Sequence, residues 1–551
     1  MGRVRSVRPA GLSEKRSPVN PKNLRRFARR SLPPGAAVSA LLAGAGVAVA
    51  TTFAAGVPVA VPDHPLGGGA ACAALVAQQE ARGSVNHPAS EVEPYVAADP
   101  ADPRHLVGSA QQDRWNDGGS NGLTTVVSRD GGATWTPAAA QPAFSICAGA
   151  TAGSPGYFQR TTDPWVSFSA DGRVVYSIAD SFNADGPAFG GASAILVSRS
   201  LDGGDHWETP VVARLDTSTQ VLNDKETVTA DPLLADRAYA VWDQLVSPQS
   251  HANPSAYTHA ITYRGPAYFS RTTDRGATWS TGRIIFDPGQ NDQTIGNQIV
   301  VPTTGPARGV LIDGFDLITN KGGACPYTHG GRHCRGSSTS TAAVVRSTDG
   351  GTTWSGAIGI DTQQVASVTI AGHPVRSSDE LPEFAVNPVN GFVYAVWQDA
   401  RFSATGASKI AFAQSADGGL TWGDTIRVDQ APGDTPAFVP QIRVTADGTI
   451  GLSYYDLQNA TAAQPGLTDA FLAHCHAATS DCGNPANWAV NGRTRLTATS
   501  FDFTTAPDAG GYFLGDYSGL AATGPALTAY FGVARPVAVS GASDIFANHA
   551  G

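Results

Sequence analysis

Charged residues and long helical patterns are both scarce in this 551-residue sequence. Only 15% of the residues are charged, whereas soluble domains average about 25%, and no long stretch repeats apolar residues at helical spacing. Helical bundles and coiled coils are therefore excluded. The chain has instead 62 glycines and 37 prolines, which is typical of many short strands joined by turns. The sequence predicts an all-β fold.

Basic residues are also scarce outside the N-terminal region. The first 35 residues hold ten Lys or Arg side chains and a single acid, Glu14. The rest of the chain is therefore more acidic than the overall net charge of −9 indicates. Such a surface repels nucleic acid and anionic lipid, so neither is expected as a partner.

The basic N-terminal segment is followed by an uncharged run of small residues over 36–55. This order indicates an export leader, with an uncleaved membrane anchor as the alternative, and no other stretch is long and apolar enough to span a bilayer. We predict a leader or anchor over 1–60, an Ala/Gly-rich linker over 61–90, and a single domain over 91–551. We expect a secreted or cell-surface monomer.

Cysteine is rare, and the six residues fit an oxidising compartment. Four of the cysteines form two pairs that are close in sequence and flank one loop each, and the remaining two cysteines form a third pair. An alternative for the loop closed by Cys325 and Cys334 is a zinc knuckle, because it contains two histidines, but an exported chain favours the disulfide. The predicted disulfides are Cys325–Cys334, Cys475–Cys482 and Cys72–Cys147.

Five similar octapeptides occur along the chain. Each copy begins with Ser or Thr, has Asp at its third position and ends in Trp. The aspartates lie 68 to 75 residues apart, a period typical of one supersecondary unit copied around a ring. A short apolar strand precedes each copy, so we expect a hairpin turn in which Asp accepts turn N–H groups and Trp packs between units. The five structural aspartates are Asp130, Asp202, Asp274, Asp349 and Asp417.

These octapeptides resemble the Asp-box, or BNR repeat, of the sialidase-like β-propellers. The resemblance implies a propeller fold over about residues 90–550. Strands that precede each copy continue past the fifth one, near Pro440 and again near Tyr512. Counting them predicts seven blades, whereas the sialidase resemblance implies six as the alternative.

Carboxylates, arginines and tyrosines are expected together on the face opposite the Asp-boxes. In a four-stranded antiparallel blade, loops between the third and fourth strands emerge on one face, and the 2–3 loops and blade crossings emerge on the other. Ligands are therefore expected at that second mouth. A purely structural alternative is that the Asp that recurs at one position of each blade caps the next strand. A ring of acids could also hold structural Ca²⁺, but calcium-loop spacing is absent, so no metal or cofactor is required.

The family resemblance also implies roles for individual residues. Sialidases bind the substrate carboxylate with arginines, protonate the leaving group with an Asp, and attack through a Tyr activated by a Glu. The Phe-Arg-Ile-Pro motif expected ahead of the first Asp-box is missing from this chain. The candidates are Arg114, Arg160, Arg376 and Arg401 for the carboxylate, Asp117 or Asp113 as acid, and Tyr455 or Tyr517 with Glu226 or Glu380 as nucleophile pair.

The leading hypothesis is an exported exo-α-sialidase that removes terminal sialic acid or a related acidic sugar from glycans. One alternative is a non-catalytic extracellular propeller that binds glycan or protein. Another is a glycosidase acting on a neutral polysaccharide with two carboxylates, such as Asp117 and Asp399. Only the sialidase requires several arginines to converge on one point.

Overall fold

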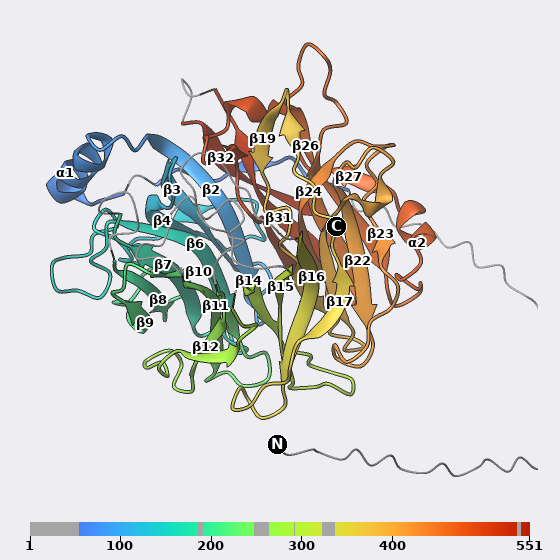
Figure 1. Cartoon of the computed structure of the whole chain (residues 1–551), viewed down its shortest axis with the longest axis horizontal. Coiled ribbons are helices and arrows are strands. Elements are labelled where there is room, and N and C mark those ends of the chain that lie inside the picture. Colours follow the sequence, from blue (N-terminus) through green and yellow to red (C-terminus); the bar gives the residue numbers. More distant parts are fainter. Residues whose placement is uncertain are drawn as a thin grey trace, which may run out of the picture. The chain divides into compact units, whose positions relative to one another are not determined.

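The computed structural model describes residues 54–64, 66–184, 191–246, 264–290, 292–321, 337–536 and 541–551. The chain divides into two units, Met1–Val49 and Ala50–Gly551, and the described residues all belong to the second. This unit is nearly all-β (Figure 1). Its described helices are α1 (Gly69–Glu80), α2 (Ala486–Ala489) and the 3₁₀ turns η2 (Ala400–Phe402) and η3 (Phe503–Thr505).

Most strands form antiparallel sheets in which neighbours in sequence are also neighbours in space. The first two such groups are joined through one pairing, Ser120 with Thr161. Their strands are β2 (Asn86–Ala98), β3 (Leu106–Trp115), β4 (Ser120–Ser128) and β5 (Thr136–Pro137), then β6 (Arg160–Phe168), β7 (Val175–Phe182), β8 (Ser193–Ser200) and β9 (Val211–Asp216).

Four further groups repeat the same order. The first two contain β10 (Val221–Ala230), β11 (Ala238–Val246), β12 (Ala267–Thr272) and β13 (Arg283–Phe286), then β14 (Gln293–Val300), β15 (Leu311–Lys321), β16 (Ser337–Ser347) and β17 (Ile358–Thr362). The next two contain β20 (Glu383–Val386), β21 (Val393–Asp399), β22 (Lys409–Ser415) and β23 (Ile426–Arg427), then β24 (Ala437–Val444), β25 (Thr449–Asp456), β26 (Leu467–His476), β27 (Arg493–Arg495) and β28 (Phe501–Asp502).

The last sheet combines both ends of the described chain. It has the order β1 (Val59–Ala60), β32 (Ser543–Ala550), β31 (Ala526–Ala534) and β30 (Gly519–Thr523). Val59 and Ala60 pair antiparallel with Ala547 and Phe546, so the N-terminal segment supplies the outer strand of the C-terminal sheet. These two residues satisfy the otherwise unpaired edge of β32, and the leader boundary at residue 60 stays a prediction.

The segment predicted as a linker over 61–90 differs from expectation. It contains α1 and the start of β2, with Val61 and Leu75 buried. Its small residues suggested a linker, but alanine is the best helix former, and the disulfide from Cys72 to Cys147 attaches this helix to the loop before β6.

The first strands of successive sheets pack against one another. β2 packs against β6, β6 against β10, β10 against β14, β14 against β20, β20 against β24 and β24 against β30, and β30 packs against β2. The succession therefore returns to its start. In Figure 1 the sheets follow one another from the blue strands to the red ones. Hydrophobic clusters lie between neighbouring sheets, as in the cluster that joins Val107, Ile178 and Val228.

The five repeated octapeptides form the same hydrogen-bonded turn. In the first copy the Gly132 N–H donates to Ser128 Oγ at 2.9 Å, and the Thr134 N–H donates to Asp130 Oδ1 at 2.8 Å. The other copies repeat the bond between glycine and hydroxyl. The terminal tryptophans pack toward the preceding sheet, as Trp354 does against Phe269 with ring centroids 5.4 Å apart. These aspartates are thus occupied by backbone and hydroxyl groups of their own turns.

A small three-stranded sheet was not anticipated. It consists of β18 (Thr369–Ile370), β19 (His373–Arg376) and β29 (Tyr512–Phe513), and β19 pairs in parallel with β29. It joins the segment before β20 to the segment before β30. Ile370 and Val375 are buried in one cluster with Phe438. This sheet places Arg376 and Phe513 beside each other.

Two of the three predicted disulfides, Cys72–Cys147 and Cys475–Cys482, are present. Their presence is consistent with an oxidising, extracytoplasmic compartment. The third predicted pair, Cys325–Cys334, lies outside the described residues. Among the helices of the described ranges, none is long and apolar enough to cross a membrane.

Candidate active site

Five first strands, β2, β6, β10, β14 and β24, carry a β-bulge at equivalent positions. In β14 and β24 the bulge holds Gly296 and Val439, and in the other three strands it holds a charged residue. The pairing register shifts between Val92 and Tyr95, between Thr162 and Trp165, and between Asp224 and Thr227. The residues inside these bulges, Glu93, Asp163 and Lys225, have φ values of 53°, 53° and 51°. Positive φ is rare for residues other than glycine, and bulges re-aim side chains, often at functional sites. All three of these re-aimed side chains are charged.

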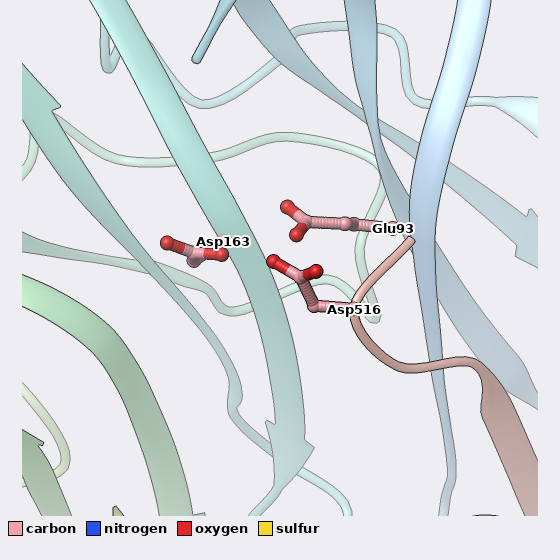
Figure 2. A group of neighbouring side chains, drawn as sticks. All are labelled: Glu93, Asp163 and Asp516. Atoms are coloured by element: carbon pink, nitrogen blue, oxygen red, sulfur yellow. The ribbon is translucent and has the colours of Figure 1, made fainter. Parts of the chain in front are cut away.

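The three bulges bring their side chains together with Asp516. Lys225 Nζ lies 2.6 Å from Asp516 Oδ2, 2.8 Å from Asp163 Oδ1 and 3.3 Å from Glu93 Oε1. One oxygen from each carboxyl group lies within 4.8 Å of the others, and Figure 2 shows the three groups facing a common point. We call these four residues the Lys225 cluster. All four side chains are buried.

A metal ion is a second way to balance such a group of carboxylates. Glu93, Asp163 and Asp516 form the group of metal-ligating side chains that the described residues bring together. The Lys225 ammonium already contacts an oxygen of each. A cation at this point would have to compete with that ammonium for the same oxygen atoms.

Two arginines extend the cluster. Arg376 Nη2 and Nε donate to the two oxygens of Asp516 at 2.6 and 3.1 Å, a bidentate pair. The guanidinium carbons of Arg376 and Arg114 lie 4.4 and 4.8 Å from the centroid of the Phe513 ring. The ring from the small sheet therefore holds two guanidinium groups at the edge of the cluster.

Gln111 links Arg114 to the carboxylates. Arg114 Nη1 donates to Gln111 Oε1 at 2.8 Å, and Gln111 Nε2 donates to Glu93 Oε2 and, at 2.9 Å, to Thr162 Oγ1. Glu93 thus contacts an ammonium on one oxygen and a neutral amide on the other. This leaves it with less positive charge around it than Asp516, which is bound by both Lys225 and Arg376.

The two carboxyl groups therefore titrate in opposite directions. Burial, with the charge of Asp163 adding to it against that of Lys225, raises the pKa of Glu93 to about 8. Burial also acts to raise the pKa of Asp516, but the charges of Arg376 and Lys225 hold it well below its usual range. At neutral pH one group carries a proton and its neighbour is ionised, the division that acid and base roles require.

A second layer of acids lies behind Asp163 and Lys225. Asp224 pairs across the strands with Asp243, and Thr162 with Asp180. Glu226 Oε1 accepts the backbone N–H of Asp180. Burial first, and then neighbouring carboxylates, raise the pKa values of Asp180, Glu226 and Asp243. Burial raises the pKa of Asp224 as well, against the charges of Lys225 and Arg376.

A cavity of about 20 Å³ adjoins the Lys225 cluster. This volume is room for roughly one water molecule. Glu226 and Glu383 line it, with Tyr517 and Trp165. The outer oxygens of Glu226 and Glu383 have no hydrogen-bond partner among the described residues, so a water molecule here would find acceptors.

Neither predicted tyrosine nucleophile hydrogen-bonds a glutamate among the described residues. Tyr517 lines the cluster, but its hydroxyl donates to Pro164 O at 3.1 Å, and burial together with the charge of Glu93 raises its pKa far above normal. The Tyr455 hydroxyl donates to Gly532 O at 2.8 Å within an aromatic group that includes Phe503. Burial raises the pKa of Tyr455 as well.

Of the predicted glutamate partners, Glu226 lines the same small cavity as Tyr517. Its charge, after burial and the charges of Glu93 and Asp163, adds to the rise in the pKa of that phenol. Glu226 accepts from the Asp180 backbone, as described above. Glu380 is buried, and its backbone oxygen accepts from Gln363. Its carboxylate charge contributes to raising the pKa of Asp316. The role of Glu226 or Glu380 as the glutamate that activates a tyrosine nucleophile remains a prediction.

The four predicted arginines do not converge on one point. Arg114 and Arg376 share Phe513, but Arg160 Nη1 donates to Asp117 Oδ1 at 2.6 Å and its guanidinium covers Trp115. Arg160 Nε also donates to Gln79 of α1 at 2.5 Å. Arg401 lies 2.5 Å from Asp361 and 3.0 Å from Asp399. Arg160 and Arg401 are thus engaged by carboxylates of the protein itself.

The predicted general acids, Asp117 and Asp113, hydrogen-bond to nearby loop and backbone groups. Asp117 pairs with Arg160 and accepts from Ser84 Oγ at 2.6 Å, with 47% of its side chain exposed. Asp113 has a φ of 60° and accepts the Ala89 N–H at 2.8 Å. These bonds fix the loop and the β2 backbone, and neither carboxylate belongs to the Lys225 cluster.

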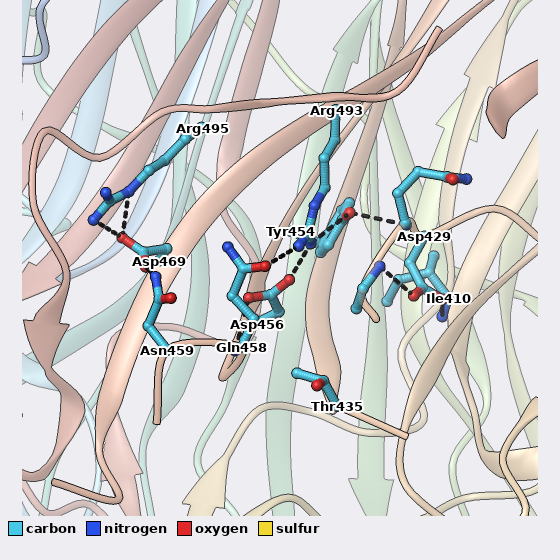
Figure 3. A network of polar contacts seen from close by, with 12 residues as sticks. Ile410, Asp429, Thr435, Tyr454, Asp456, Gln458, Asn459, Asp469, Arg493 and Arg495 are labelled. Carbon is cyan, nitrogen blue, oxygen red and sulfur yellow. Dashed lines mark hydrogen bonds and ion pairs between the residues drawn. The ribbon is translucent and has the colours of Figure 1, made fainter. Parts of the chain in front are cut away.

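Acids at the ends of later second strands pair sideways with arginines of their own sheet. In Figure 3, Asp456 at the end of β25 meets Arg493 of β27, which also contacts Gln458. Arg495 lies 2.5 Å from Asp469 in the same network. The Arg493 guanidinium covers the Phe471 ring at 3.9 Å. Pairing with arginine gives Asp456 a structural role that differs from the strand capping considered in the sequence analysis.

Sequence reasoning did not include Glu93, Asp163, Lys225 and Asp516 among the candidate site residues. Two of them did carry a signal, since Glu93 precedes Pro94 and Asp163 precedes Pro164 at the same point of successive first strands. A charged residue before proline in a buried strand is costly unless it is paired. The partner, Lys225, comes from a third strand and has no such marker.

The sequence matches no protein-family model and no curated protein sequence. Among solved structures, a Dyadobacter fermentans protein of unknown function is 12% identical, with a TM-score of 0.43 over 91% of this chain and 99% of that one. An α-L-arabinofuranosidase from Fusarium graminearum, in complex with an iminosugar inhibitor, is 12% identical, with a TM-score of 0.42 over 73% and 93%.

An intramolecular trans-sialidase from Ruminococcus gnavus, in complex with oseltamivir carboxylate, is also similar. It is 12% identical, with a TM-score of 0.39 over 69% of this chain and 91% of that one. The function of the chain is therefore inferred from the geometry of its own residues.

Proposed function

We propose that this protein is a glycoside hydrolase in which carboxyl groups of the Lys225 cluster act on a neutral terminal sugar. The observation that carries the proposal is the convergence of Glu93, Asp163 and Asp516, whose nearest oxygens lie within 4.8 Å of one another. Glycosidases that retain configuration use two carboxyl groups about 5–5.5 Å apart, and inverting ones use a wider gap of about 6.5–9.5 Å. The close spacing supports the retaining course.

Opposite protonation states support roles for two of the groups. Glu93, with a pKa raised to about 8, holds a proton that it can donate to the glycosidic oxygen. Asp516 stays ionised beside Lys225 and Arg376, so it can attack the anomeric carbon or stabilise positive charge there. Water would then release the sugar, with Glu93 acting as base.

A neutral sugar is favoured over the acidic sugar of the sialidase hypothesis. Recognition of a substrate carboxylate calls for guanidinium groups that converge on it. Arg160, Arg376 and Arg401 are each within 2.6 Å of a carboxylate oxygen of the protein, and they lie in separate contacts.

We also propose that the domain is a seven-bladed β-propeller that acts outside the cytoplasm. Support for seven blades comes from the first strands β2, β6, β10, β14, β20, β24 and β30, each packed on the next. A six-bladed ring would have to leave one of these strands out. Support for the location comes from the two disulfides.

Hydrolysis of a panel of neutral 4-nitrophenyl glycosides by the full-length chain tests the proposal, with a 4-methylumbelliferyl α-sialoside included. We expect turnover of a neutral glycoside between pH 5 and 7, lowered at least 100-fold by Glu93→Gln and by Asp516→Asn. Asp417→Asn, in an octapeptide turn, is the matched control and should retain activity. Thermal unfolding shows whether each variant folds.

Chemical rescue separates catalysis from a structural role. Azide should restore turnover of an activated glycoside to Asp516→Gly and yield a glycosyl azide, because the small anion replaces the missing nucleophile. Absence of neutral-glycoside turnover in the folded wild type would overturn the proposal. Sialoside turnover that is lost in Arg114→Ala would restore the sialidase hypothesis instead.

A further inference from the structure

A second cavity, of about 590 Å³, lies at the other end of the first strands. Its rim includes Asp99 and Pro103 of the turn between β2 and β3. That turn lies beside the repeated octapeptides, because the Gly131 N–H donates to Arg104 O and His105 Nε2 lies 2.8 Å from Gly203 O. The cavity is therefore on the octapeptide face, opposite the face where the sequence predicted a ligand. We call this cavity the funnel.

The floor of the funnel separates it from the Lys225 cluster. Tyr95 and Trp165 stack there with ring centroids 3.5 Å apart, and Arg443 Nη2 donates to the Tyr95 hydroxyl across the centre. Trp165 and Gln298 line both the funnel and the one-water cavity. A molecule seated in the funnel thus stays on the far side of this floor from Glu93.

The funnel wall is largely apolar and carries a single uncompensated charge. Its charged lining residues are Asp99 and Arg443. Asp99 is engaged by its own turn, through the Ala101 N–H at 2.8 Å and His105 at 3.3 Å. The rest of the lining includes Phe168, Val228, Ile299, Phe384, Val444 and Ala522.

Arg443 makes no ion pair within the described ranges of the chain. Its guanidinium contacts are the Tyr95 hydroxyl and, at 3.3 Å, the carbonyl oxygen of Ile442. Glu383 lies below the floor, where it lines the one-water cavity, and burial raises its pKa to about 7 against the charge of Arg443. Below that pH, the positive charge of Arg443 faces the funnel without a balancing carboxylate.

We propose that the funnel binds a small amphiphilic anion, with its apolar body against the strand ends and its carboxylate or sulfonate on Arg443. The volume falls within the range of about 300–1,000 Å³ that is typical of small-molecule sites. A guanidinium in a poorly hydrated wall binds an oxyanion with charge-assisted hydrogen bonds, and the apolar lining gains from covering a hydrocarbon body. This site is independent of the proposed hydrolase activity.

Fluorescence titration of the full-length chain with 8-anilinonaphthalene-1-sulfonate, followed by displacement with octanoate, tests the proposal. We expect saturable binding of the dye and displacement by octanoate at concentrations at least 10-fold lower than by 1-octanol, which lacks the charge. Arg443→Gln should raise the octanoate concentration needed at least 10-fold and leave the octanol value unchanged. Ala522→Phe should weaken binding of both, because it fills the funnel.

Arg104→Gln is the matched control. This arginine lies on the same rim, with 74% of its side chain exposed, and it is not among the funnel-lining residues. Its removal should leave dye and octanoate binding unchanged. The proposal would be overturned by any of three results. These are equal displacement of the dye by octanoate and octanol, an unchanged octanoate concentration in folded Arg443→Gln, and no saturable dye binding.

Discussion

The two ends of the same first strands have opposite characters. At their beginnings, three bulges place Glu93, Asp163 and Lys225 in a dense charged cluster with room for about one water molecule nearby. At their ends the wall turns apolar around a cavity of about 590 Å³. Positive φ at the bulges re-aims these side chains, and the charged residues at three of the bulges give this end its character. The proposed hydrolysis is assigned to the charged end, and the proposed anion binding is assigned to the apolar end.

Removal of the central ammonium should give the largest effect. Lys225→Met leaves three buried carboxyl groups without their shared cation, and breaking a buried ion pair costs about 3–5 kcal/mol. We expect a loss of that size in the free energy of unfolding at pH 7.5, measured by urea denaturation. The loss should shrink at pH 5, where the carboxyl groups can take up protons.

A second substitution sharpens this expectation. Asp516→Asn removes one of the carboxylates, so Lys225→Met should cost less in that background than in the wild type, as a double-mutant cycle would show. A loss that is the same at both pH values, or fully additive with Asp516→Asn, would show that the charges of the cluster are not coupled.

The pH dependence of stability should differ between the cluster and the funnel floor. Glu93 and Glu383 have pKa values raised to about 8 and about 7, so the folded chain keeps protons that the unfolded chain has released. Each group therefore contributes stability below its unfolded pKa and loses it as the pH rises toward its folded value, at about 1.4 kcal/mol per pH unit.

Urea denaturation from pH 4.5 to 9 measures this difference. Glu93→Gln should remove part of the decline up to about pH 8, and Glu383→Gln should remove only the part that ends near pH 7. Identical profiles for the two variants would mean that the cluster and the floor titrate alike. Gln is the matched replacement in both because it keeps the shape of the protonated acid.

The repeats were predictable from the sequence, whereas the site was only partly so. The octapeptides such as Ser128–Trp135 carry their turn chemistry locally, through Ser, Asp and Gly within a few residues. The Lys225 cluster depends on bulges in three separate strands, and a bulge changes which way a side chain points without changing the apolar pattern of its strand. The position of Asp516 beside these bulges is a consequence of how sequence-distant strands pack.

Two other predictions concern residues whose contacts are distant in sequence. Composition alone suggested a linker over 61–90, but this region contains α1, and the disulfide at Cys72 attaches that helix to the loop before β6. Motif position placed Arg160 in a substrate site, whereas α1 and Asp117 engage it. In both cases the deciding partner is distant in sequence, so local patterns could not reveal it.

Arg443→Met should give the smallest change in stability and so complete the comparison with Lys225→Met. Arg443 is half-buried beside an open cavity, and the Tyr95 hydroxyl that loses its donor can be hydrated from the funnel. We expect a loss within about 1 kcal/mol, since a polar group that regains water avoids most of the cost of an unmade hydrogen bond. A loss as large as that of Lys225→Met would show that the floor of the funnel contributes as much to stability as the Lys225 cluster does. The division between a rigid charged end and an adaptable apolar end would then not hold.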